Sequence, residues 1–322
     1  MNISVLGCGR WGSFIANYLA TKGNNVYLWG RSGGKSYESL LKTRANDYMQ
    51  LNDTVNLTCD LDLALQSNII VISILTKELD SFLKDIKQKI VSEKTIIFCM
   101  KGIDPETSET LTEIAIHNGF NKNNLAVWVG PGHVQNFMQG IPSCMVISAY
   151  NLDLAKDLQQ KLSSNLIRFY VNPDIVGVQI GSASKNVVGI MSGLLDGLGW
   201  QSLKGALMAR ATYEYARLVN KMNGDGLTIY GLSHLGDYEA TLFSPFSHNR
   251  MFGECLSKGE KYNLSAEGVF NVKGFHALSQ KYNVDMPLTN SLYKIIFEGA
   301  DIKEQISQLF SREQKQEFCW EC

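Results

Sequence analysis

Short runs of apolar residues alternate with amphipathic stretches along the first half of the chain. The runs are typical of buried strands, whereas the stretches between them, such as residues 12–23 and 77–90, carry apolar residues at helical spacing. Because strands that alternate with helices form parallel sheets through crossover connections, this pattern predicts a doubly wound α/β sheet. The expected strands are Ile3–Gly7, Val26–Trp29, Ile69–Ile74, Thr95–Met100, Leu125–Gly130 and Cys144–Ser148.

The pattern changes after Asn172, where strand signals disappear and helical periodicity takes over. Asparagine is a favoured N-cap residue and proline suits the first helical position, so Asn172 and Pro173 predict a long helix that opens a second domain. We therefore expect a doubly wound domain over residues 1–172 and an all-helical domain over residues 173–322.

The sequence GCGRWG, from Gly7 to Gly12, fits the pattern G-x-G-x-x-G directly after the first expected strand. Gly7 and Gly9 would permit a tight turn and the close approach of a pyrophosphate, and Gly12 would let the following helix pack closely on the strand. The start of that helix offers free amides and the positive end of a dipole. The motif in this context predicts a Rossmann-type domain that binds a nicotinamide dinucleotide.

The end of the second strand bears on which dinucleotide is bound. NAD-selective sites place an acidic residue there, on the ribose 2′-hydroxyl, but this chain has Gly30 and Arg31. Our hypothesis is that Arg31 faces the adenosine ribose and accepts a 2′-phosphate, which favours NADP(H) over NAD(H). The alternative is a solvated loop arginine.

Composition narrows the class of protein further. With 322 residues, 45% hydrophobic and 19% charged, the chain can form two domains with substantial cores. A net charge of −1 argues against binding nucleic acid or a membrane surface, and the absence of a leader or a spanning apolar run predicts a cytoplasmic protein. Seven scattered cysteines suggest reduced thiols. For the terminal pair Cys319 and Cys322 we favour a frayed tail over a redox pair, and we expect no metal site.

Lys185 is a single charge on an otherwise apolar helical stretch. On a helix its neighbours are Gly181 and Ser182 on one side and Val188 and Gly189 on the other. These neighbours are mostly small, so they would leave room for a substrate beside the amine. Desolvation there would lower its pKa from about 10.4 toward neutral pH, which suits a general base. The alternative is a lysine that reaches out to solvent.

A series of motifs in this order resembles the bacterial NAD(P)-dependent glycerol-3-phosphate dehydrogenases. The series is GCGRWG, LWGR, MKG (100–102), GPGH (130–133), GVQIGSASKN (177–186), DGLG (196–199), GLSHLGD (231–237), SHNRMFG (247–253) and AEGVFN (266–271). The resemblance implies a nucleotide-binding domain, a helical substrate domain and an active site between them. It also implies the reduction of dihydroxyacetone phosphate to sn-glycerol 3-phosphate for glycerophospholipid biosynthesis.

The resemblance assigns roles to individual residues. In the family, the lysine that matches Lys185 takes the C2 hydroxyl proton as hydride leaves for the nicotinamide, and residues that match Asp237 and Thr241 hold lysine and substrate in place. The implied substrate contacts are Lys101, Gly130, Gly132, Asn186, Ser247, His248, Asn249 and Arg250. The implied cofactor contacts are Gly7, Gly9, Arg10, Trp11, Gly12, Arg31, Val134, His248 and Glu267.

Three positions depart from the family pattern. Gly132 stands where a serine or threonine is usual, Val134 where an alanine is usual, and His248 where an arginine contacts substrate and cofactor. Losing that charge-assisted contact would weaken phosphate binding by roughly 1.5 to 3 kcal/mol. Arg250 is retained and is the candidate to replace it in part.

Two other functions stay open at this point. Gly132 and His248 allow a dehydrogenase of another small phosphorylated or acidic hydroxy compound, and a catalytically weak paralogue that senses NADP is the remaining alternative. The intact set of Lys185, Asp237 and Thr241 argues against the sensor, which needs no general base. For a dehydrogenase, the expected partner is a small phosphorylated substrate. Apolar surface on the helical domain would also allow a homodimer.

Overall fold

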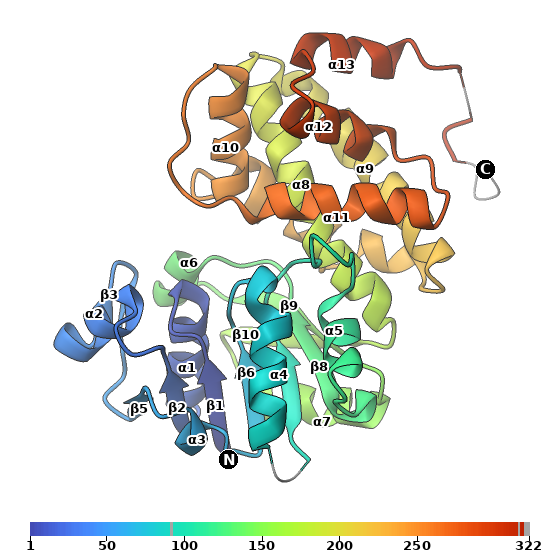
Figure 1. Cartoon of the computed structure of the whole chain (residues 1–322). Coiled ribbons are helices and arrows are strands. Elements are labelled where there is room, and N and C mark those ends of the chain that lie inside the picture. The colour runs from blue at the N-terminus through green and yellow to red at the C-terminus, as the bar shows by residue number, and fades with distance from the viewer. Residues whose placement is uncertain (91–92, 315, 319–322) are drawn as a thin grey trace. The chain divides into compact units, whose positions relative to one another are not determined.

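The apolar runs of the first half form one eight-stranded sheet in the computed structural model, which describes residues 1–90, 93–314 and 316–318. The strand order is β10-β9-β8-β7-β6-β1-β2-β5 (Figure 1). The strands are β1 (Asn2–Leu6), β2 (Asn25–Trp29), β5 (Val55–Thr58), β6 (Ile69–Ile72), β7 (Thr95–Phe98), β8 (Leu125–Val129), β9 (Ser143–Ala149) and β10 (Ile167–Asn172).

The sheet is parallel from β5 to β8, as predicted, but β9 runs antiparallel to β8 and β10 pairs in parallel with β9. The prediction of parallel strands throughout was therefore wrong at this edge. Between β8 and β9 lies only the five-residue helix α6 (Val134–Met138). Such a short connection does not carry the chain back across the sheet, so the next strand returns antiparallel.

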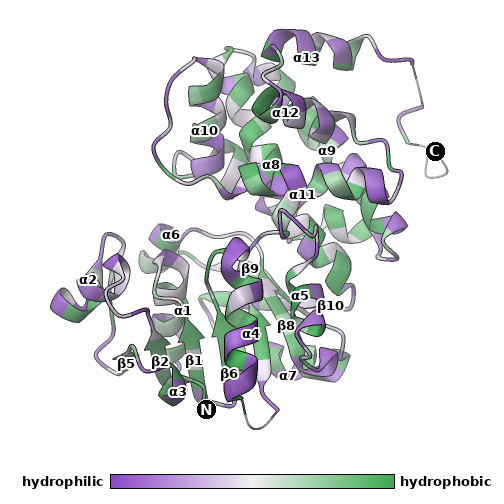
Figure 2. Ribbon diagram, viewed as in Figure 1, coloured by the Kyte–Doolittle hydropathy of each residue, from purple (hydrophilic) through white to green (hydrophobic). Residues whose placement is uncertain are grey.

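Helices cover the sheet, and its strands β6 and β8 are apolar throughout (Figure 2). Every residue of β6 and of β8 is buried, which explains why both read as continuous apolar runs in the sequence. The helices of this part are α1 (Arg10–Thr21), α2 (Lys35–Thr43), α3 (Leu61–Ala64), α4 (Leu79–Lys89), α5 (Leu111–His117) and α7 (Leu152–Leu162), with the 3₁₀ turns η1 (Thr76–Glu78) and η2 (Lys122–Asn124). The sequence pattern missed β5, β10 and a small hairpin of β3 (Ala45–Asn46) and β4 (Met49–Gln50).

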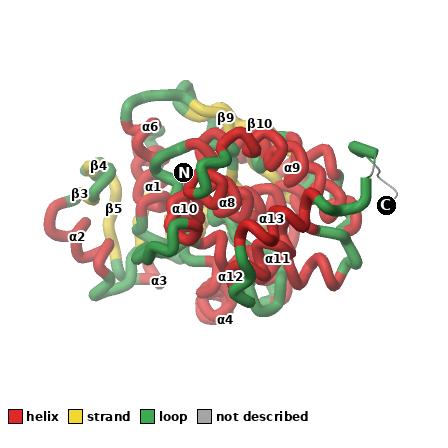
Figure 3. The backbone as a smooth tube through the Cα atoms, turned by 90° about the horizontal axis from the view of Figure 1, so that it is seen from above, coloured by secondary structure: helices red, strands yellow, loops and turns green. Residues whose placement is uncertain are grey.

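The second part is helical within the described residues, as the red tube in Figure 3 shows, so the predicted fold class is confirmed. Its helices are α8 (Ile175–Gly197), α9 (Lys204–Lys221), α10 (His248–Ser257), α11 (Glu267–Lys281), α12 (Pro287–Phe297) and α13 (Ile302–Phe310). Short helical turns connect them: η3 (Gln201–Leu203), η4 (Gly226–Tyr230), η5 (Leu235–Asp237) and the π-helical turn η6 (Glu239–Phe243). In the part of the chain that the structure describes, no helix combines the length and apolarity needed to cross a membrane.

The long helix α8 begins at Ile175, not directly after Asn172 as predicted. Asn172 is instead the last residue of β10, and its Oδ1 accepts a hydrogen bond of 2.8 Å from the backbone N–H of Asp174. The asparagine does satisfy a backbone amide, but in a turn between strand and helix, a use of asparagine that the sequence does not distinguish from a helix cap.

The chain divides into two compact units that do not follow a single boundary. One unit comprises Met1–Met100 and Leu111–Ile175, and the other comprises Lys101–Thr110 together with the chain from Val176 onward. The single boundary predicted at residue 172 did not anticipate that Lys101–Thr110 belongs to the helical unit. Cys319 and Cys322 lie outside the described residues.

Glycines on one face of α8 allow α10 to approach its backbone. A Cβ atom added at Gly193 would lie 1.9 Å from the carbonyl oxygen of Arg250, and one added at Gly253 of α10 would lie 2.0 Å from that of Ile190. Neither position therefore accepts a larger residue without a shift of the backbone. The two helices form a rigid frame for the side chains that α8 carries.

Candidate functional site

Two lysine side chains converge on one carboxylate oxygen in the helical unit. The Nζ atom of Lys185, in the middle of α8, lies 2.5 Å from Oδ2 of Asp237 at the end of η5. The Nζ atom of Lys101 lies 2.8 Å from the same oxygen. The Asp237 side chain is fully buried, and the lysine side chains are 8% and 18% exposed, respectively. The sequence predicted all three residues as site residues, and the structure brings them together.

The other carboxylate oxygen of Asp237, Oδ1, is buried and accepts no hydrogen bond within the described residues. A buried acceptor without a donor costs about 1 to 3 kcal/mol, so structures seldom leave one unused. A hydroxyl group is a donor that would satisfy this oxygen beside the two ammonium groups. Oδ1 is therefore the acceptor of the cluster that the described residues leave without a donor.

Near neutral pH, the electrostatics of the cluster allow both the charged and the neutral form of the Lys185 amine. Burial is the largest influence and lowers the pKa of the amine to about 7. The negative charge of Asp237 opposes this shift, and the positive charge of Lys101 adds to it. Because desolvation prevails, the amine can both give and take a proton at physiological pH.

Two asparagine side chains hold the backbone that carries Lys101. The Nδ2 atoms of Asn186 and Asn271 both donate to the carbonyl oxygen of Lys101, over 3.1 and 3.3 Å. Asn271 also donates to the carbonyl of Ala183 and accepts from the N–H of Ile103, so it ties the Lys101 segment to α8. Asn271 was not predicted as a site residue, although it closes the motif AEGVFN.

The segment around Asp237 is fixed to α8 by a buried histidine that the sequence reasoning also missed. His234 contacts the Gly181 carbonyl oxygen (3.0 Å) and the Ser184 hydroxyl (2.9 Å) through Nδ1, and the Tyr238 hydroxyl (2.6 Å) through Nε2. Burial lowers the pKa of His234 to about 4, so the ring is neutral. A carbonyl only accepts, which assigns the proton to Nδ1 and makes Nε2 the acceptor of the tyrosine O–H.

Thr241 lies on the π-helical turn η6, and its hydroxyl donates to the carbonyl oxygen of Asp237 over 2.8 Å. Its methyl group packs at Gly189 of α8, where an added Cβ would lie 2.9 Å away. Single π-turns often occur at functional sites because they re-aim side chains. Here the turn supports the backbone of the carboxylate.

In the sheet unit, the glycine turn after β1 fits a dinucleotide. Gly7 has a φ of 115°, and a Cβ there would lie 2.1 Å from the Ser73 carbonyl oxygen, whereas the space at Gly9 is open. A Cβ at Gly12 would lie 1.9 Å from the Gly7 carbonyl oxygen. No side chain caps α1 and no acidic residue lies in its first turn. A pyrophosphate could therefore approach the backbone here, as the sequence predicted.

Comparison with known proteins agrees with this pair of sites. Residues 2–155 match the family model described as NAD-dependent glycerol-3-phosphate dehydrogenase N-terminus, and residues 174–307 match the model of its C-terminus. The chain belongs to the NAD-dependent glycerol-3-phosphate dehydrogenase family.

Relatives of similar length support the membership. The glycerol-3-phosphate dehydrogenase (NAD(P)+) of Staphylococcus epidermidis is 32% identical over 98% of this chain and 99% of that protein. The enzyme of the same name from Clostridium botulinum is 34% identical over 98% of both chains. The crystal structure of the glycerol-3-phosphate dehydrogenase from Coxiella burnetii superposes with a TM-score of 0.90 at 28% identity, over 97% of this chain and 99% of that one.

Several residues implied by the family resemblance make structural contacts here. Ser247 caps α10 by accepting from the Arg250 N–H, and Asn249 accepts from the Gly268 N–H at the start of α11. His248 Nδ1 lies 2.6 Å from the Tyr262 hydroxyl. Their contacts with substrate or cofactor stay predictions.

Arg250, the candidate to replace the family's arginine, is already engaged. Its Nη1 lies 3.0 Å from Asp196 Oδ2 and 2.9 Å from Glu254 Oε2, and its Nε donates to the Ser244 carbonyl oxygen. These contacts occupy Nη1 and Nε, and the two carboxylates offset the positive charge of the guanidinium. The contacts give it a structural role, and its substrate role stays a prediction.

The remaining predicted residues lie in or near turns. In the sheet unit, the Arg10 guanidinium stacks over the Tyr48 ring and the Trp11 ring lies 5.3 Å from that of Phe14, while Val134 is buried at the start of α6. In the helical unit, Glu267 is the first residue of α11.

Two further predicted residues follow strands of the sheet unit. Arg31, after β2, forms an ion pair of 2.8 Å with Glu78. Gly130 has a φ of 134° after β8.

The structure shows what a side chain at Gly132 would contact. Its φ is 151°, and an added Cβ would lie 2.4 Å from the ring of Phe137. The aromatic ring occupies the space that a serine or threonine side chain would need. A serine or threonine at this position would therefore require the Phe137 ring to shift.

Replacing Gly132 with serine is expected to destabilise the protein by about 1 to 3 kcal/mol, because the side chain meets Phe137 and the backbone is strained. The penalty should shrink in a Phe137→Leu background, where the ring is gone. Thermal unfolding of the four proteins of this double-mutant cycle measures the coupling. Equal penalties in both backgrounds would mean that Phe137 is not the obstacle.

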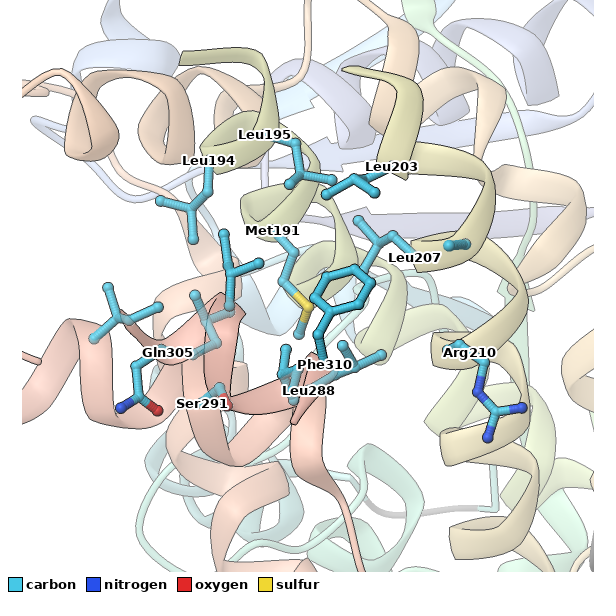
Figure 4. A pocket seen from close by; sticks show the side chains of 15 residues that line it. Met191, Leu194, Leu195, Leu203, Leu207, Arg210, Leu288, Ser291, Gln305 and Phe310 are labelled. Atoms are coloured by element: carbon cyan, nitrogen blue, oxygen red, sulfur yellow. The ribbon is translucent and has the colours of Figure 1, made fainter. Parts of the chain in front are cut away.

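A hollow of about 210 Å³ lies among α8, α9, α12 and α13. Figure 4 shows Met191, Leu207, Leu288 and Phe310 gathered around it, while the guanidinium of Arg210 points away from them. Its lining is almost wholly apolar and offers no pair of acid and base. The hollow is therefore not suited to proton chemistry.

Filling this hollow with Ser291→Leu is expected to raise the free energy of unfolding by about 0.5 to 2 kcal/mol, since Ser291 lines it from α12. Chemical denaturation measures the change. Ser307→Leu on the exposed side of α13 is the matched control and should not stabilise. Equal effects of the two substitutions would contradict the cavity-filling explanation.

Proposed function

We propose that this chain reduces dihydroxyacetone phosphate reversibly to sn-glycerol 3-phosphate with NAD(P)H, a reaction that feeds glycerophospholipid biosynthesis. The observation that carries the proposal is the cluster of Lys185, Lys101 and Asp237, which holds a buried amine with a pKa near neutrality beside an unused carboxylate oxygen. The names of the relatives support the same substrate.

The cofactor would lie against the glycine turn of Gly7, Gly9 and Gly12 and the start of α1. When bound, it supplies hydride in the reduction and receives it in the oxidation. Arg31, after β2, is the candidate contact for a 2′-phosphate, which favours NADP(H). The predicted contacts of Arg10, Trp11, Val134, His248 and Glu267 belong to the same proposal.

The proton is handled by Lys185. In the reduction its ammonium group donates a proton to the oxygen at C2 as negative charge develops there, and in the oxidation the neutral amine takes that proton back. Asp237 orients the amine through Oδ2, and its Oδ1 is placed to accept a hydrogen bond from a substrate hydroxyl. Lys101 supplies positive charge for the substrate phosphate.

The experiment follows the oxidation of NADPH and of NADH with dihydroxyacetone phosphate, unphosphorylated dihydroxyacetone and other phosphorylated ketones. The Lys185→Met variant serves as the blank. Turnover with dihydroxyacetone phosphate that the substitution abolishes is the expected result. Turnover with another phosphorylated ketone alone would replace the substrate, and cofactor binding without any turnover would favour the sensor.

The cellular setting forms part of the proposal. We expect a cytoplasmic enzyme that acts as a homodimer on a small phosphorylated substrate. Sedimentation of the purified protein measures the oligomeric state, and a monomer at micromolar concentration would contradict the homodimer.

A further inference from the structure

An ion pair spans the glycine turn at the carboxyl edge of the sheet. Arg31 follows β2 by two residues, and Glu78 ends η1, which follows β6. In the sheet β1 lies between β6 and β2, so the two residues come from the strands on either side of the one that leads into the turn. Their side chains meet with Arg31 Nη2 2.8 Å from Glu78 Oε2.

This edge is where doubly wound sheets bind dinucleotides, and the end of the second strand is where they contact the adenosine ribose. The loop after β6 also contacts the turn, since a Cβ at Gly7 would meet the Ser73 carbonyl oxygen. Glu78 is thus connected by a short segment to the backbone that shapes the turn. Among the described residues, it is the one carboxylate that forms an ion pair with Arg31.

The pair is exposed to solvent and easily broken. The Arg31 side chain is 62% exposed and that of Glu78 35%. Exposed ion pairs contribute little to stability, so a stronger partner such as a phosphate can displace the carboxylate. A 2′-phosphate carries a charge of the same sign as Glu78, and the two would compete for one guanidinium.

We propose that Glu78 determines cofactor selectivity by competing with the 2′-phosphate of NADP(H) for Arg31. The inference rests on the proposed function, in which Arg31 faces the adenosine ribose. With NADH bound, the carboxylate of Glu78 neutralises the positive charge of Arg31. With NADPH bound, Arg31 must exchange this carboxylate for the 2′-phosphate. The carboxylate therefore reduces a preference for NADPH that Arg31 alone would give.

The test is Glu78→Gln, which removes the charge and keeps the shape of the side chain. We expect the ratio of kcat/KM for NADPH to that for NADH, measured with dihydroxyacetone phosphate, to rise about two- to fivefold. The gain should shrink in high salt, which screens exposed charges. It should vanish when Arg31→Gln is added.

Asp62→Asn is the matched control, because it removes one negative charge from the same unit and breaks an exposed pair of 2.7 Å with Lys89. An equal gain in this control would attribute the effect to net charge and overturn the proposal. An unchanged ratio in Glu78→Gln, while Arg31→Gln weakens NADPH use, would also overturn it but leave the Arg31 hypothesis standing. Turnover of dihydroxyacetone phosphate by the unmodified protein reports separately on the proposed function.

Discussion

Replacing Lys185 with methionine is expected to lower kcat about a hundred- to ten-thousandfold, the usual contribution of a positioned acid or base. The amine is the titratable group of α8 in the cluster, and burial places its pKa at about 7. Methionine keeps the length and the apolar stem of the side chain but carries no proton to transfer. Steady-state and single-turnover oxidation of NADPH with dihydroxyacetone phosphate measure the loss.

A second buried lysine of the helical unit provides the control. The Lys204 side chain is 9% exposed and its Nζ lies 2.8 Å from Asp196, so its burial and ion pair resemble those of Lys185. Lys204→Met should cost stability but should not lower kcat to the same degree. Comparable losses in the two variants, or retention of more than about a tenth of kcat by Lys185→Met, would contradict the assignment.

The direction of the pH dependence follows from the same pKa. The reduction needs the charged form of Lys185, so its rate should fall as the pH rises above about 7. The oxidation needs the neutral amine, so its rate should fall as the pH drops below about 7. Rates measured in both directions should show opposite slopes, and a slope of the same sign in both would exclude Lys185 as the group that titrates.

Replacing Asp237 with asparagine is the second large effect and is expected to lower kcat/KM about a hundred- to a thousandfold. The substitution preserves the shape of the side chain but leaves Lys185 and Lys101 without the carboxylate that both contact. Without this carboxylate, the positive charge of Lys101 acts unopposed by Asp237 on the buried Lys185 amine, so Lys185 should lose its proton at a lower pH. The rate of reduction should therefore decline from a more acidic pH than in the unmodified protein.

The acidic shift separates this role from a loss of folding. Asp196→Asn also removes a partly buried carboxylate from between two cations, Lys204 and Arg250, and should reduce stability without moving the pH profile. Thermal unfolding of both variants gives the structural cost. An unchanged profile in Asp237→Asn would mean that the carboxylate does not set the protonation of Lys185.

The sequence predicted those features that depend on local pattern. The positions of strands β1, β2, β6, β7, β8 and β9 follow from periodicity. The glycine turn and the lone lysine of α8 follow from residues a few positions apart. Asp237, Thr241 and Lys101 entered through the family resemblance, because nothing local marks an aspartate as the partner of a lysine far away in the sequence.

What the sequence did not predict depends on contacts between distant segments. Asn271 acts on a loop almost 170 residues earlier, His234 acts on α8, and Glu78 meets Arg31 across the sheet. Each is an ordinary polar residue within its own stretch, and only the fold shows its partner. The antiparallel β9 was missed for a related reason, since an apolar run carries no information about its direction.

The excursion of Lys101–Thr110 into the helical unit limits how the protein can be recombined. One of the two lysines on Asp237 is encoded between β7 and α5, inside the half of the gene that specifies the sheet. A chimaera joined near residue 175 would pair the helices of one relative with a Lys101 loop shaped for another. A functional chimaera should therefore take the asparagines at 186 and 271 and the loop that they hold from the same parent.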